Sequence, residues 1–148
     1  MEDAPPDWVW SLFPLFFAGL ICLVSLILST VGGWRRLAES YPDDVAVDGV
    51  TFRWQTAQFG SANYGGCLNV TVDHVRLRLA VALPFRVGHP PISIPWSDIH
   101  LELGTYWFRK IGTVRFAKEP DVVVRFPRRL VERIAEASRG QLRIEAPA

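Results

Sequence analysis

The sequence has few cysteines, and it lacks the short motifs that bring metal-binding side chains together. Its two cysteines, Cys22 and Cys67, lie in an apolar run and in a predicted strand, so we expect no disulfide. The three histidines lie in different segments, and no H-x-x-x-H, E-x-x-H or C-x-x-C spacing occurs. We therefore expect neither a metal site nor a cofactor.

Nucleotide-binding and nucleic-acid-binding patterns are also missing. The glycine-rich stretch "FGSANYGG" (59–66) has no lysine and is not followed by a predicted helix, so it does not match a phosphate-binding loop. We interpret it as a flexible hairpin loop. The basic residues form no dense stripe, which argues against a nucleic-acid partner.

Charge is absent from one long stretch near the N-terminus. The 26 residues from Trp8 to Gly33 contain no charged side chain. A bilayer core about 30 Å thick needs roughly 20 apolar residues in a helix. The run is too uniformly apolar for a one-faced surface helix, so it predicts a membrane span over residues 8–33.

The flanks of this span predict an uncleaved anchor and its orientation. A cleavable signal peptide starts with basic residues and has a shorter apolar core, whereas this chain starts with the acidic "MEDAPPD". Arg35 and Arg36 directly follow the span, and basic flanks stay cytoplasmic. We expect a single-pass protein of the inner cell membrane, with residues 1–7 outside and everything after the span in the cytoplasm.

Tryptophans lie at both ends of the span. Indole rings favour the headgroup level of a bilayer, which would place Trp8 and Trp10 at one surface and Trp34 at the other. Trp34, Arg35 and Arg36 are therefore candidate membrane-surface contacts. The other interpretation of the tryptophans is simple packing against protein.

The remaining chain divides into a short connection and a β-rich domain. "GWRRLAESYP" extends the helix past the membrane until Pro42, and "PDDVAVDG" is an acidic linker, so residues 34–49 form the connection. Residues 49–148 carry 14 basic and 8 acidic groups, a balance that mildly suits anionic partners.

Alternation of apolar and polar residues predicts about seven short strands in this domain. The alternating stretches are 51–59, 67–72, 75–83, "ISIPW", "DIHLEL", 113–117 and 121–126. The next segment, "PRRLVERIAEASRG" (127–140), has Leu130, Val131 and Ile134 at helical spacing between a starting proline and a stopping glycine. This order predicts a mainly-β α+β fold, an open barrel with a helix plugging one side.

Two segments of the domain carry a resemblance to a known superfold. "ISIPWSDIHLEL" (92–103) resembles a strand pair common in bacterial pleckstrin-homology-like (PH-like) and GRAM-like domains, and "DVVVRFPRRLVERI" is similar to their last strand and helix. The resemblance covers about residues 50–139 and assigns residues 50–148 to a PH-like domain. It implies a binding or scaffolding module of a bacterial single-pass protein, without naming its ligand. In "IPWSDI", Ile94, Trp96 and Ile99 are expected to fill the core.

Three functions follow from these observations. The first is a non-catalytic adaptor that binds a protein partner at the inner leaflet. The second is a sensor of anionic lipid, because Trp107 lies beside Arg109 and Lys110 in "YWFRKIG", a pattern suited to a bilayer surface unless the aromatic residues pack in the core. The third is a small hydrolase that uses Asp98 and His100 with Cys67 or Ser97, although no nucleophile-elbow motif occurs.

Overall fold

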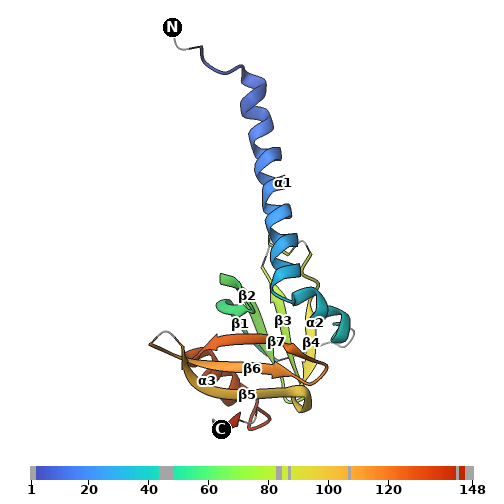
Figure 1. Cartoon of the computed structure of the whole chain (residues 1–148), viewed down its shortest axis with the longest axis vertical. Helices are drawn as coiled ribbons and strands as arrows, with labels where there is room; N and C mark the ends of the chain where they lie inside the picture. Colours follow the sequence, from blue (N-terminus) through green and yellow to red (C-terminus); the bar gives the residue numbers. More distant parts are fainter. Residues whose placement is uncertain are drawn as a thin grey trace.

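A computed structural model describes residues 3–43, 49–82, 85–86, 88–106, 108–142 and 144–145. Figure 1 shows one long helix standing on a compact β-domain, with the N-terminus at the far end of the helix. Strands predominate in the domain, so the predicted mainly-β α+β class is confirmed.

Helix α1 (Asp7–Val31) is long and apolar enough to cross a membrane. Its 25 residues rise about 37 Å, more than the hydrocarbon thickness of a bilayer. Large apolar side chains are exposed along most of its length, whereas Ser25 and Ser29 are buried. The helix ends at Gly32, and Gly33 has a φ of +81°, which turns the chain into the next helix.

Helix α2 (Trp34–Ser40) is part of the β-domain. Trp34 and Leu37 on this helix and Tyr41 directly after it belong to the main hydrophobic core. The backbone N–H of Ser93 donates to the Tyr41 carbonyl at 3.1 Å, and the Ser40 hydroxyl donates to Glu119 at 2.7 Å. The core therefore begins at Trp34, within the segment that the sequence analysis assigned to a connection.

The Tyr41 side chain ties the end of α2 to the 3-10 turn at Asp98 and to the hairpin turn at Lys118. Its hydroxyl donates to the Asp98 carboxylate at 3.0 Å and accepts the backbone N–H of Lys118 at 2.9 Å. Burial, more than the neighbouring Asp98 charge, raises the pKa of Tyr41 to about 12. The tyrosine is thus neutral at physiological pH and acts as a structural tie.

The sheet is antiparallel except at one edge. Its strand order is β4-β3-β2-β1-β7-β6-β5-β8. The strands are β1 (Val50–Phe59), β2 (Ala62–Val72), β3 (Arg76–Val81), β4 (Ile92–Pro95), β5 (Ile99–Tyr106), β6 (Arg109–Phe116), β7 (Glu119–Pro127) and β8 (Ile144–Glu145). A 3-10 turn, η1 (Trp96–Asp98), joins β4 to β5, and the short β8 pairs in parallel with β5.

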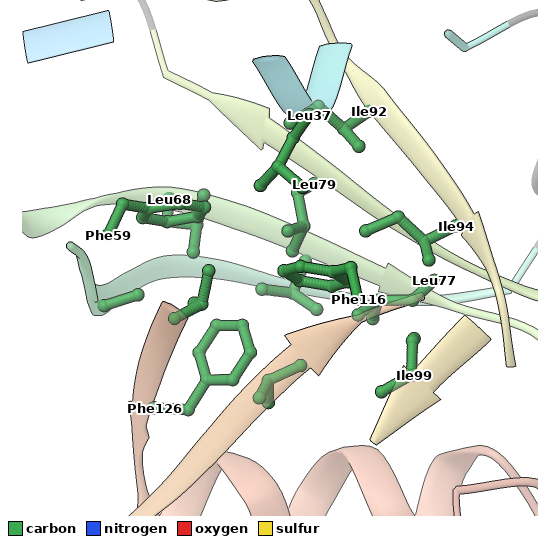
Figure 2. Packing of buried hydrophobic residues seen from close by; sticks show 14 of the residues in the cluster. Leu37, Phe59, Leu68, Leu77, Leu79, Ile92, Ile94, Ile99, Phe116 and Phe126 are labelled. Atoms are coloured by element: carbon green, nitrogen blue, oxygen red, sulfur yellow. The ribbon is translucent and has the colours of Figure 1, made fainter. Parts of the chain in front are cut away.

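Helix α3 (Arg128–Ala137) covers one side of the sheet, as predicted. Leu130, Val131 and Ile134 are buried against the core, which confirms the apolar stripe. Gly112 on β6 makes this contact possible, because a Cβ there would lie 2.5 Å from Val131 Cγ2. Figure 2 shows the core between the strands, with Leu37 near Ile92 and Leu79 at one end and α3 beyond the other.

The "IPWSDI" segment also has the predicted structural role. Ile94, Trp96 and Ile99 all lie in the core. The Trp96 indole N–H donates to the backbone carbonyl of Asp73 at 2.9 Å, which satisfies its polar atom.

The glycine-rich stretch at residues 59–66 contains a hairpin turn, as predicted, but most of it is strand, so the prediction of a loop over the whole stretch is wrong. Strand β2 begins at Ala62, and only Gly60 and Ser61 separate it from β1. Gly60 has a φ of +57°, which suits a tight hairpin turn. Phe59 and Tyr64 are buried on the two sides of this turn. The burial of these aromatic side chains holds the segment in the sheet despite the glycines around them.

Candidate functional site

Trp34 is not a membrane-surface residue, and the prediction for it is wrong. Its side chain is 0% exposed and lies 5.0 to 5.8 Å, between ring centroids, from Phe59, His89 and Tyr64. The indole N–H donates to the Pro90 carbonyl at 2.8 Å. The structure confirms the other interpretation of this tryptophan, which is packing against protein.

Arg35 and Arg36 lie on the outer side of α2. Arg35 is 3.7 Å from Glu39 one helical turn later, and Arg36 is 3.8 Å from Glu119 at the start of β7. Both pairs are long and largely solvated, and such pairs contribute little to stability. Both side chains are exposed close to the end of α1, and their contact with lipid headgroups stays a prediction.

Arg109 and Lys110 begin β6 at the tip of the β5–β6 hairpin. Phe108, immediately before them, is 99% exposed and has a φ of +65°, so the interpretation that it packs in the core is wrong. Trp107 lies outside the described residues. Arg109 and Lys110 are both exposed, and they line a cleft in the surface of the β-domain.

This cleft, called the basic cleft here, has a volume of about 620 Å³. Three basic side chains and no acidic one stand among the described residues that line it. The lining residues are Thr56, Ala57, Gln58, Asn63, Arg109, Lys110, Ile111, Arg125, Phe126 and Pro127. Such a surface attracts anionic groups, and the side-chain amides beside it can donate or accept hydrogen bonds.

Strand pairing brings the parts of the basic cleft together. Asn63 on β2 pairs with Gln58 on β1, and Gln58 pairs in turn with Arg125 on β7. Ile111 on β6 pairs with Pro127 at the end of β7. Asn63, Gln58 and Arg125 thus form a row across three strands, and the Ile111–Pro127 pair lies two residues further along β7. Residues up to 64 positions apart in the chain meet here.

Sequence reasoning found Arg109 and Lys110 but missed the rest of the basic cleft. Thr56, Gln58, Asn63 and Arg125 stand on predicted strands or in the misassigned glycine-rich stretch, where single polar residues carry no special signal. Their common location depends on the β1–β7 pairing, which no local pattern encodes.

A second cleft lies between α3 and the ends of β1 and β2. Its volume is about 560 Å³, and Phe52, Val50 and Ala137 form its apolar part. Its charged groups have both signs: Asp73 and Glu136 are acidic, and Arg133 and Arg139 are basic. A mixed surface of this kind has no clear ligand class.

The four hydrolase candidates come from three elements: Ser97 and Asp98 lie in η1, His100 lies on β5, and Cys67 lies on β2. Asp98 accepts a hydrogen bond from Tyr41, and Cys67 is half-buried on β2. Burial raises the pKa of the Cys67 thiol, which keeps it protonated and weakly nucleophilic. Neither the basic cleft nor the cleft beside α3 contains Cys67, Asp98 or His100.

A buried polar pair lies where the β-domain meets α1. The Tyr64 hydroxyl and His89 Nε2 are 2.7 Å apart, and both residues are buried against Trp34. Burial raises the pKa of the Tyr64 hydroxyl. His89 lies in the β3–β4 connection and serves as a packing and hydrogen-bonding group there.

No protein-family model matches this chain, and no curated protein is significantly similar to it. The features of the chain that bear on its function are an apolar helix, a β-domain that incorporates the helix after it, and a basic cleft.

Proposed function

We propose that the chain is a single-pass membrane protein whose PH-like domain is a non-catalytic binding module at the inner leaflet. The length and apolar surface of α1 support the membrane span. The exposed Arg35 and Arg36, just after α1, support a cytoplasmic domain, because basic flanks stay on that side.

The strand order supports the PH-like part of the proposal. Strands β1 to β4 form one run of neighbours, β7 to β5 form another, and α3 covers the sheet after the last strand of that set. The first segment that carries the resemblance, residues 92–103, forms β4, η1 and part of β5. It therefore passes from the first run of strands to the second.

One observation carries the functional proposal: α2 is built into the core of the β-domain. Trp34 and Leu37 are fully buried, and only Gly32 and Gly33 separate α2 from α1. A domain held in this way keeps a fixed height and orientation at the membrane. A binding surface on it is then presented to membrane partners at a high effective concentration.

The basic cleft is the surface that we assign to binding, and an acidic segment of a partner protein is the ligand that suits it. Arg109, Lys110 and Arg125 supply positive charge, while Gln58 and Asn63 offer hydrogen bonds to an extended backbone. The exposed Phe108 beside the cleft adds an aromatic contact of the kind that interfaces favour.

Photo-crosslinking in native membranes tests this proposal. A photoreactive amino acid at Asn63, which lines the basic cleft, is expected to give a discrete protein adduct. The double variant Arg109→Glu/Lys110→Glu is expected to reduce that adduct at least tenfold, because two reversed charges cost more than the 1.4 kcal/mol that a tenfold change requires.

The matched control carries the same amino acid at Val75, an exposed residue between β2 and β3 outside the basic cleft. Equal adducts from positions 63 and 75, or an adduct that survives the charge reversal, would contradict the proposal. An adduct with the mass of a phospholipid would replace the protein ligand by anionic lipid.

A further inference from the structure

The connection between β3 and β4 lies against the last turns of α1. A Cβ added at Gly88 would lie 2.8 Å from Leu26 Cδ2 and 3.4 Å from its Cα, so the backbone of the connection touches the helix. The Ser29 hydroxyl donates a hydrogen bond to the Gly88 carbonyl. In Figure 1 this connection rises beside the end of α1 that joins the domain.

The serines of α1 mark the helix face that the connection covers. Ser25 and Ser29 are one turn apart and only 1% and 2% exposed, whereas the neighbouring Val24 and Ile27 remain about half exposed. A hydroxyl in an apolar span is best placed where protein atoms accept its hydrogen bond. One side of the last two turns of α1 is thus protein-facing, and the other side is open to lipid.

The height of this contact can be derived from the helix itself. If the hydrocarbon begins near Trp8, about 20 residues of 1.5 Å rise place its other boundary near Ile27. The second count starts at Gly32, taken as the outer edge of the headgroup layer. Leu26 is six residues earlier and therefore about 9 Å deeper, while the headgroup layer is about 5 to 7 Å thick. Both counts place Gly88, beside Leu26, at the boundary between acyl chains and headgroups.

Two exposed side chains stand two and three residues before Gly88 in the connection, and the His89 N–H donates to the Arg86 carbonyl at 2.9 Å across the turn that contains Gly88. Phe85 is 42% exposed and Arg86 is exposed, although the segment has fixed backbone contacts. The Phe85 N–H donates to the Ala82 carbonyl at 3.0 Å, and Arg86 Nε donates to the Val81 carbonyl at 3.1 Å. An aromatic ring beside a guanidinium suits the layer in which acyl chains meet phosphates.

We propose that the β3–β4 connection is a second membrane contact, in which Phe85 enters the lipid interface and Arg86 lies at the phosphate level. The ligand is the bilayer surface itself. This inference rests on the membrane span of the proposed function. It adds that the β-domain is partly embedded and does not merely stand beside the membrane.

Depth-dependent fluorescence quenching tests the inference on the full chain. Cys22 and Cys67 are replaced by alanine, and Phe85→Cys carries an environment-sensitive label in vesicles of phosphatidylcholine and phosphatidylglycerol. We expect the label at position 85 to be quenched at least twofold by lipids with a nitroxide near the headgroup. Arg86→Cys gives an independent measurement from the same connection, and circular dichroism checks the fold of each variant.

Two matched positions separate the possible outcomes. Phe16, exposed in the middle of α1, is expected to be quenched by deep nitroxides, and Val75, exposed on the β2–β3 connection, by none. If positions 85 and 86 behave like position 75 while position 16 is quenched, the inference fails and the span stands. If position 16 is not quenched either, the span fails, and the inference fails with it.

Discussion

Replacing Trp34 by alanine is expected to lower the free energy of unfolding of the β-domain by about 3–5 kcal/mol, the usual cost of truncating a buried aromatic residue. The side chain is fully buried against Phe59, Tyr64 and His89, and its loss also leaves the Pro90 carbonyl without the indole donor. In detergent, the thermal midpoint of the full chain should fall by more than about 10 °C, followed by circular dichroism.

Trp10→Ala is the matched control for this experiment. Trp10 is exposed at the far end of α1, so its removal should leave the thermal midpoint of the β-domain nearly unchanged. If Trp34 were instead a lipid-facing anchor, the two substitutions would have equally small effects on the midpoint, and the incorporation of α2 into the core would be refuted.

Gly33→Ala is the second substitution with a large expected effect. Gly33 has a φ of +81°, a left-handed conformation that costs other residues about 1–2 kcal/mol. A Cβ there would also lie 2.8 and 3.1 Å from the two methyl groups of the buried Val122. We expect a total destabilisation of about 2–4 kcal/mol, measured by the same thermal unfolding.

A double substitution separates the two causes. Val122→Ala makes room for the new Cβ, so the double variant should be less destabilised than the sum of the single variants by about 1–2 kcal/mol. Gly65→Ala is the control, because no heavy atom lies within 4 Å of a Cβ at that position. If Gly33→Ala lowers the free energy of unfolding no more than Gly65→Ala does, the close packing described between Gly33 and the β-domain is refuted.

The elements with strong periodic patterns were predictable from the sequence. The apolar run at residues 8–33 predicted helix α1 to within about two residues at each end, and period-two alternation located most strands. The stripe of Leu130, Val131 and Ile134 predicted which face of α3 is buried. In each case a local pattern decides, because one face of the element meets the same apolar surroundings along its length.

Trp34 shows why the junction was harder to predict. An indole at the end of a span is equally at home in a lipid interface and in a protein core, since both bury its apolar ring and satisfy its N–H. The spacing of Trp34, Leu37 and Tyr41, three and four residues apart, was the signal for a buried helix face. The acidic residues that follow Tyr41 suggested a solvated linker, so this signal for a buried helix was not used.

The basic cleft was predictable only in part. Arg109 and Lys110 attract attention because they are adjacent and follow aromatic residues. Thr56, Gln58 and Asn63 become their neighbours only through the pairing of β1 with β7, and such non-local pairing has no signature within either strand.

The claim on which this account depends most is that α1 crosses the membrane and leaves the β-domain in the cytoplasm. Thiol labelling of sealed cells tests it directly, with Trp8→Cys and Val75→Cys each placed in a chain whose two native cysteines are replaced by alanine. An impermeant maleimide should label position 8 in intact cells and position 75 only after permeabilisation. Labelling of position 75 in sealed cells would contradict the account, and so would release of the chain from membranes by alkaline carbonate.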